Sequence, residues 1–115
     1  MKKQKLKNIL FDIGFALATF IVVLLFYENI ALATILLLII AIIGLLKWKS
    51  KRTLMIFLFA GVFGTIAEII AVKVGIWDYQ ISNFYNIPLW LFIVWANAGA
   101  FIYQIAKEIR EKRLK

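Results

Sequence analysis

Few residues in this sequence could carry out chemistry, and the strongest candidate is Glu68, a carboxylate inside a long apolar stretch. A charged side chain at the centre of a bilayer costs at least about 2.5–3.5 kcal/mol on insertion scales, so such a residue is expected to have a function or a buried partner. A buried carboxylate can give and take a proton, and Asn97 and Tyr79 could orient it. We therefore interpret Glu68, Asn97 and Tyr79 as candidate catalytic residues.

The expected depth of Glu68 in a membrane nearly coincides with that of Asn97. Glu68 lies 15 residues after Thr53, where one apolar stretch begins, and Asn97 lies 9 residues after Pro88, where the next begins. At 1.5 Å per residue, these positions are about 22 Å and about 13 Å from opposite faces of a hydrocarbon layer about 30 Å thick. Antiparallel packing of the two stretches therefore predicts that the Asn97 amide donates to the Glu68 carboxylate. Such a bond could serve catalysis or only hold two helices together.

The segment 77–87, between these two stretches, is short and rich in aromatic residues. Trp and Tyr prefer the membrane interface, so an aromatic belt explains this composition as well as the mouth of a pocket does. In the pocket interpretation, polar and aromatic side chains surround a long apolar ligand that carries a small polar group. The candidate ligand-contacting residues are Thr65, Trp77, Asp78, Asn83 and Trp90.

Four apolar stretches must position these residues, at about 9–27, 30–46, 53–77 and 88–106. Of the 115 residues, 64% are hydrophobic, and a helix needs about 20 mostly apolar residues to cross a bilayer. We expect the first stretch to stay as a span and not to be removed as a signal peptide, because it is long enough to cross and the next follows almost at once. The sequence predicts an all-α integral membrane four-helix bundle, with one transmembrane domain over residues 1–115.

The basic residues predict how the bundle is oriented. All of them except Lys73 lie before the first span, between the second and third spans, or after the fourth. By the positive-inside rule, both termini and the 47–52 loop are expected on the cytoplasmic side of the cell membrane. Membrane lipids are the expected partners. Nucleic acid is not, because the basic clusters flank spans and no soluble domain accompanies them.

Small and polar residues recur on one face of the third and fourth spans. Residues at spacings of three or four share a helix face, and small ones let another backbone approach closely. On the fourth span, Trp90, Asn97 and Gln104 recur every seven residues. On the third span, the stripe consists of Gly61, Gly64, Glu68 and Gly75.

Asp12 lies about one turn inside the first span, near its basic end. There it could reach Lys5, Lys7 or the water among the lipid headgroups, and a structural role is the simpler interpretation. Trp48, just beyond the second span, is typical of an interfacial anchor.

The residue types that are absent narrow the chemistry. The chain has no His and no Cys, and it lacks the HExxH, CxxC, GxGxxG and P-loop patterns. We therefore expect no metal site and no cofactor. Two possibilities remain for the function: proton transfer by one carboxylate, or binding without chemistry.

The acid, glycine and aromatic pattern around Glu68 resembles that of integral-membrane enzymes of carotenoid metabolism. These are the carotenoid hydratases of the bisanhydrobacterioruberin type and, more distantly, the small membrane lycopene cyclases. The matching positions are Glu68, Gly75, Tyr79 and Pro88. The resemblance implies an apolar isoprenoid substrate and an intramembrane acid. The cyclases carry an acidic pair soon after the proline, where this chain has Trp90 and Leu91.

Three functions stay open from the sequence. The protein could modify or bind an isoprenoid or other lipid, with Glu68 as proton donor or acceptor. It could be a small proton-coupled transporter that works as a dimer, and so as a homo-oligomer, since four helices and one membrane glutamate suffice for such exchange. It could also be a binding or assembly subunit without chemistry.

Overall fold

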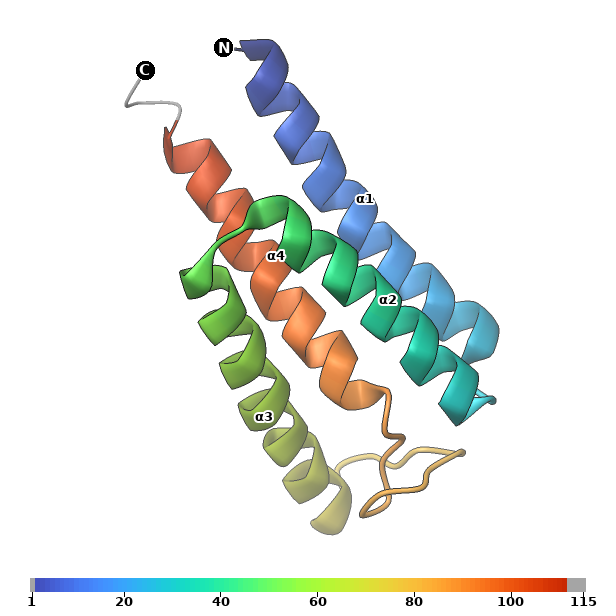
Figure 1. Ribbon diagram of the computed structural model, residues 1–115. Coiled ribbons are helices and arrows are strands. Elements are labelled where there is room, and N and C mark those ends of the chain that lie inside the picture. The colour runs from blue at the N-terminus through green and yellow to red at the C-terminus, as the bar shows by residue number, and fades with distance from the viewer. Residues whose placement is uncertain (1, 112–115) are drawn as a thin grey trace.

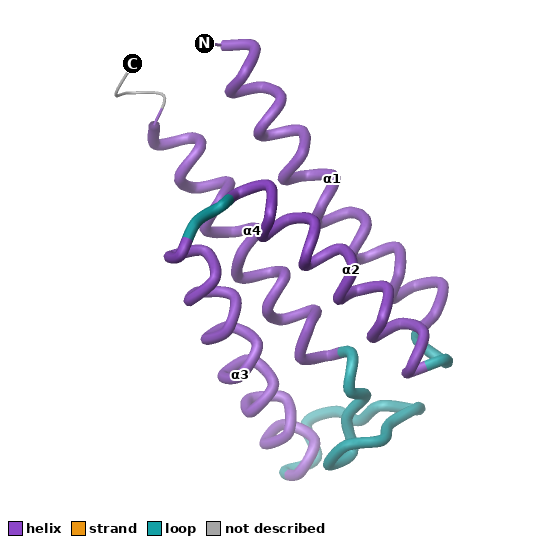
Figure 2. The backbone as a smooth tube through the Cα atoms, in the orientation of Figure 1, coloured by secondary structure: helices purple, strands orange, loops and turns teal. Residues whose placement is uncertain are grey.

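The computed structural model describes residues 2–111, and within this range the chain is helical apart from its loops. The helices are α1 (Lys2–Phe26), α2 (Ile30–Trp48), α3 (Lys51–Lys73) and α4 (Leu91–Glu111) (Figure 1). Figure 2 shows that the connections after α1 and α2 are tight turns, whereas α3 and α4 are joined by a long loop, 74–90. The predicted all-α fold with four helices is confirmed.

Polar caps fix where α2 and α3 begin. The side chain of Asn29 accepts a hydrogen bond from the Leu32 amide (3.1 Å), and that of Ser50 accepts one from the Thr53 amide (3.1 Å). Each cap satisfies a backbone donor that the first turn of a helix leaves free. Two short turns with a cap at the following helix therefore force α1, α2 and α3 to run alternately up and down.

Helix α3 ends at Lys73, four residues before the predicted end of the third span at residue 77. Gly75 has a φ of 88°, which glycine adopts without strain. Its amide donates to the Val72 carbonyl (3.1 Å), and the Ile76 amide donates to the Ala71 carbonyl (2.9 Å). This paired arrangement is the Schellman motif, which stops a helix and reverses the chain. Gly75 therefore lies beyond the helix and not on its predicted stripe.

Helix α4 begins at Leu91, later than the predicted start at Pro88. The Leu91 amide donates to the Pro88 carbonyl (3.1 Å), so a single turn precedes the helix. The side chain of Asn83 accepts from the Leu89 amide (2.9 Å). Ile87 and Pro88 are fully buried, so the end of the loop is packed into the bundle.

The bundle is apolar outside and partly polar inside. Large apolar side chains such as Leu10, Leu24, Phe63 and Ile70 are exposed along α1 and α3. An apolar exterior of this extent suits lipid and not water. The buried polar residues are Asp12, Thr19, Thr53, Thr65, Glu68, Asn97 and Gln104.

Among the described residues, α1, α2 and α3 are long and apolar enough to cross a membrane. Helix α4 differs because Asn97, Gln104 and Lys107 lie within it. Asn97 and Gln104 are buried, as is Trp90 just before the helix. Helix α4 contacts each of the other three helices, so its buried polar side chains pack against these helices.

The closest packing is between α3 and α4, where small residues oppose one another. A Cβ atom on Gly99 would lie 2.4 Å from the Cβ of Ala60, and one on Gly61 would lie 3.1 Å from the Cβ of Ala96. Gly64 lies under the indole ring of Trp95. The predicted close approach at Gly61 and Gly64 is confirmed, and Gly99 extends it to α4.

The basic segments lie at one end of the bundle. The start of α1 lies beside the end of α4 (Figure 1), and Lys5 Nζ donates to the Glu108 carbonyl (2.8 Å). Gln104, near the same end of α4, donates to Thr53 at the start of α3. At the opposite end, Trp90 Nε1 donates to the Tyr27 carbonyl (3.3 Å). Antiparallel helices therefore separate the basic segments from the 74–90 loop.

Candidate functional site

Glu68 is held by three aromatic donors. Its Oε1 atom accepts from Tyr79 Oη (2.7 Å) and from Trp77 Nε1 (2.9 Å). Its Oε2 atom accepts from Trp95 Nε1 (3.1 Å). The residue is only 8% exposed. A carboxylate that accepts several hydrogen bonds is stabilised without a cation beside it, so the buried carboxyl group predicted in the bundle is present and well bonded.

The predicted hydrogen bond between Asn97 and Glu68 is wrong. Asn97 Nδ2 donates instead to Thr19 Oγ1 of α1 (3.1 Å), and Thr19 in turn donates to the Phe15 carbonyl (3.0 Å). Successive helical residues turn by about 100°, so Trp95 and Asn97 point about 200° apart around α4. Trp95 faces α3 and Glu68, and Asn97 faces α1. The prediction considered the position of Asn97 along α4 but not its direction around that helix.

The turn at the end of α3 brings the loop back to Glu68. Gly75 reverses the chain, and Trp77 and Tyr79, two residues apart, both reach the same carboxylate. Alternate residues of an extended segment point to the same side, whereas Asp78 between them does not share that direction. Burial of the phenol, followed by its hydrogen bond to Glu68, raises the pKa of Tyr79. Glu68 thus fastens the loop to α3 and α4.

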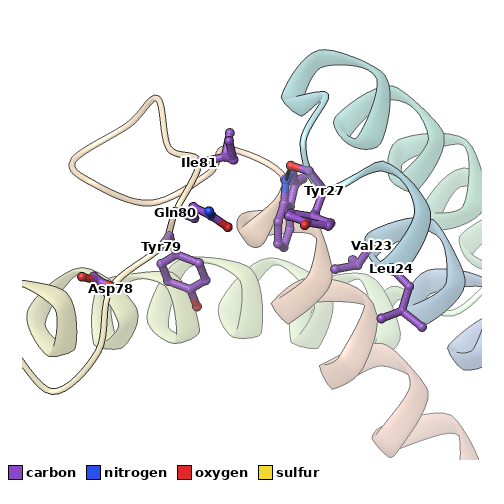
Figure 3. Close-up of a pocket in the computed structure, with 8 residues that line it drawn as sticks. Val23, Leu24, Tyr27, Asp78, Tyr79, Gln80 and Ile81 are labelled. Carbon is purple, nitrogen blue, oxygen red and sulfur yellow. Dashed lines mark hydrogen bonds between the residues drawn. The ribbon is translucent and has the colours of Figure 1, made fainter.

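A cavity of about 320 Å³ lies between this loop and the end of α1. Figure 3 shows Val23 and Leu24 of α1 and Tyr27 of the following turn on one side of it, and the loop residues Asp78 to Ile81 on the other. Three predicted ligand-contacting or catalytic residues, Asp78, Tyr79 and Trp90, line this cavity. The ring of Tyr79 faces the cavity while its hydroxyl group is bonded to Glu68.

The other predicted ligand-contacting residues lie elsewhere. Trp77 binds Glu68 and is about half exposed. Asn83 accepts from the Leu89 amide before α4, so its side chain stabilises the loop. Thr65 is fully buried on α3, and its hydroxyl group has no hydrogen-bond partner among residues 2–111. None of the three lines the cavity under the loop.

A second hollow, an apolar groove of about 340 Å³, runs between α1 and α4. Thr19 and Asn97 supply its polar groups, and Val23 lines both the groove and the cavity under the loop. The two spaces therefore adjoin along α1. Asn97 is 1% exposed, and its Oδ1 atom accepts no hydrogen bond from the described part of the chain. Burying an acceptor without a donor costs free energy, so a hydrogen bond from a ligand to this atom would be favourable.

Asp12 is buried and does not reach the basic residues as expected. It is 1% exposed, and its Oδ1 atom accepts from Trp48 Nε1 (2.9 Å). Lys5 binds backbone carbonyls at the end of α4 instead. Trp48 therefore turns its indole inward to Asp12, which the prediction of a simple interfacial anchor did not include.

Trp95 and Thr19 are the site residues that the sequence analysis missed. Asp12 and Thr19 are seven residues apart, so a polar stripe on the first span could have indicated that α1 faces Asn97. Trp95 gave no such signal, because an aromatic residue in a membrane helix is ordinary. Within residues 2–111, no group of three or more acidic, Cys or His side chains is placed to hold a metal ion.

No protein-family model matches this chain, and neither a curated protein nor a solved structure shows a significant match to it. The resemblance to carotenoid enzymes therefore stays a prediction based on a few residues.

Proposed function

We propose that this protein binds a long apolar molecule of the isoprenoid or lipid type within the membrane. The ligand would lie in the groove between α1 and α4 and extend under the 74–90 loop. The observation that carries the proposal is the Oδ1 atom of Asn97, a buried acceptor that has no donor within residues 2–111, on a side chain that lines an apolar groove. A chain with one hydroxyl group supplies the apolar surface and the missing donor.

In this proposal the bundle crosses the cell membrane four times, with both termini and the 47–52 loop in the cytoplasm. Helix α4 is less apolar than its neighbours, but it turns its polar face toward them. The basic residues at one end of the bundle support the orientation through the positive-inside rule. The cavity under the loop then lies at the outer face.

Glu68 fastens the loop in this proposal and does not act on the ligand. Both of its oxygens already accept hydrogen bonds, from Trp77, Tyr79 and Trp95. Glu68 also does not line the groove or the cavity under the loop. The modification of an isoprenoid, which the resemblance implies, is the second candidate function, because Tyr79 joins Glu68 to the cavity wall.

The proposal is tested by comparing geranylgeraniol, a long isoprenoid alcohol, with its methyl ether, which has no O–H donor. The purified protein in detergent should bind the alcohol about fivefold more tightly than the ether, since a net hydrogen bond contributes about 1 kcal/mol. In Asn97→Leu the acceptor is lost, so this preference should disappear. Binding is measured by native mass spectrometry.

The matched variant is Glu68→Gln, which changes a buried acid outside the groove. We expect it to keep the preference for the alcohol. Equal binding of alcohol and ether by the wild-type protein, or an unchanged preference in Asn97→Leu, would contradict ligand binding at Asn97. Conversion of the alcohol by wild-type protein, lost in Glu68→Gln, would favour the enzyme instead.

A further inference from the structure

A third pocket lies at the basic end of the bundle, where α1, α2 and α4 meet. Its volume is about 210 Å³. Unlike the groove, it is lined mainly by polar and charged side chains, and the two share no lining residue. Residues that line it include Asn8, Asp12, Lys47, Gln104, Lys107 and Glu108.

The charges of the side chains that line this pocket balance. Lys47 and Lys107 supply two positive charges, and Asp12 and Glu108 supply two negative ones. A net-neutral pocket that contains both signs suits a zwitterion better than an anion or a cation, because each end of the zwitterion finds an opposite charge. The pocket therefore favours a ligand that carries both a phosphate and an amine.

Asp12 lines the pocket with a side chain that is only 1% exposed. Its Oδ1 atom is bonded to the Trp48 indole, and its Oδ2 atom has no hydrogen-bond partner among the described residues. Glu108 differs, since its Oε1 atom accepts from Asn8 Nδ2 (3.0 Å). Leaving a buried carboxylate oxygen unbonded is costly, and an ammonium group would relieve that cost.

The position of the pocket indicates where such a ligand comes from. Lys47 and Trp48 are the last two residues of α2, and Lys107 lies in the last turns of α4 (Figure 1). Trp and Lys at the ends of membrane helices lie at the level of the lipid headgroups. Lys47 lies over the ring of Phe11, with Nζ 5.4 Å from the ring centroid, which holds it beside the pocket.

We propose that this pocket binds the headgroup of phosphatidylethanolamine. The primary ammonium group donates to Asp12, and the phosphodiester lies between Lys47 and Lys107. Phosphatidylcholine offers the same phosphate, but its quaternary ammonium group has no N–H to donate. Selectivity for ethanolamine over choline therefore depends on Asp12. This site is independent of the groove at Asn97.

The test compares the two lipids with identical acyl chains, by native mass spectrometry of the purified protein. Wild-type protein should bind phosphatidylethanolamine about tenfold more tightly than phosphatidylcholine, as expected for one charge-assisted hydrogen bond. In Asp12→Asn the two affinities should become equal. Glu28→Gln, which removes an exposed carboxylate at the other end of the bundle, should keep the tenfold preference.

Several results would overturn the proposal. These are equal affinity of wild-type protein for both lipids, a preference that survives in Asp12→Asn, and competition by soluble phosphoethanolamine at the concentration at which the lipid binds. The last result would assign the pocket to a free metabolite. Should Asp12→Asn fail to fold, Lys107→Gln serves instead. Lys107→Gln should weaken the binding of both lipids by a similar factor, and unchanged binding would also overturn the proposal. Asn97→Leu should leave the preference for phosphatidylethanolamine intact. The proposals for the groove and for this pocket can therefore be contradicted independently of each other.

Discussion

At the scale of single residues, the arrangement around Glu68 is a carboxylate held by neutral donors. An indole from the loop, a phenol from the loop and an indole from α4 each donate one hydrogen bond to it. Hydrogen bonds to a charged acceptor contribute more than neutral ones, about 1.5–3 kcal/mol each. A single residue of α3 therefore links the loop and α4 through hydrogen bonds.

The hydrogen bond from Tyr79 predicts a pH dependence of stability. Burial and the bond to Glu68 raise the pKa of Tyr79, so the folded protein keeps a proton that the unfolded chain loses near about pH 10. This contribution to stability is complete below that pH and is lost as the pH rises above it. Thermal unfolding in detergent, measured from about pH 8 to about pH 11, should show a falling midpoint.

In Tyr79→Phe that decline should become shallower, and the midpoint near neutral pH should be lower because one hydrogen bond is gone. Tyr85→Phe is the control, since Tyr85 lies in the same loop and is 72% exposed. It should decline as the wild-type protein does. If both variants decline equally, the bond from Tyr79 does not govern the stability of the loop.

At the scale of helices, the contact between α3 and α4 depends on residues without side chains. Gly61 and Gly64 on α3 face Ala96 and Trp95, and Gly99 on α4 faces Ala60. Lipid gives little hydrophobic driving force for association, so close van der Waals packing must hold these helices together. The same close approach brings Trp95 within reach of Glu68.

Substituting Gly99 tests this contact. Gly99→Ala places a Cβ atom 2.4 Å from the Cβ of Ala60, which is fixed to its backbone and cannot move aside. We expect a loss of about 1–3 kcal/mol of stability, as in other overpacked interiors. Gly14→Ala is the matched control, because no atom of the described residues lies within 4 Å of its new Cβ. It should be neutral or slightly stabilising. Unfolding in mixed micelles measures both, and equal effects would contradict the role of the α3–α4 contact.

At the scale of the whole molecule, the distribution of basic residues follows the arrangement of the helices. The start of α1, the turn between α2 and α3 and the end of α4 share one end of the bundle, and the long loop lies at the other (Figure 1). The basic end holds the polar pocket, and the loop end holds the apolar cavity. An asymmetry of this kind suits a protein whose two ends meet different sides of a membrane.

The chain has no Cys, so its orientation can be measured with single introduced cysteines. A membrane-impermeant maleimide added to intact cells should label Glu28→Cys and Ser82→Cys. It should label Lys51→Cys and Arg110→Cys only after the membrane is opened. Labelling of Ser82→Cys and Arg110→Cys from the same side would show that α4 does not cross, and the reverse pattern would contradict the proposed orientation.

The sequence alone determined the helical class, the number of helices and the burial of Glu68. Long apolar stretches can satisfy their backbone in lipid only as helices or closed barrels, and a buried acid had to find donors inside the bundle. The burial of Asn97 and Gln104 on one face of α4 followed from their spacing of seven residues.

Only the tertiary structure decided which donors Glu68 would find. Helical periodicity fixes which residues share a face, but not how far a helix is rotated toward each neighbour. That rotation turned Trp95 to Glu68 and Asn97 to Thr19. The reversal at Gly75, a local backbone event, then brought Trp77 and Tyr79 to the same carboxylate. The partners of a buried polar group depend on rotation and loop geometry, which apolar periodicity does not encode.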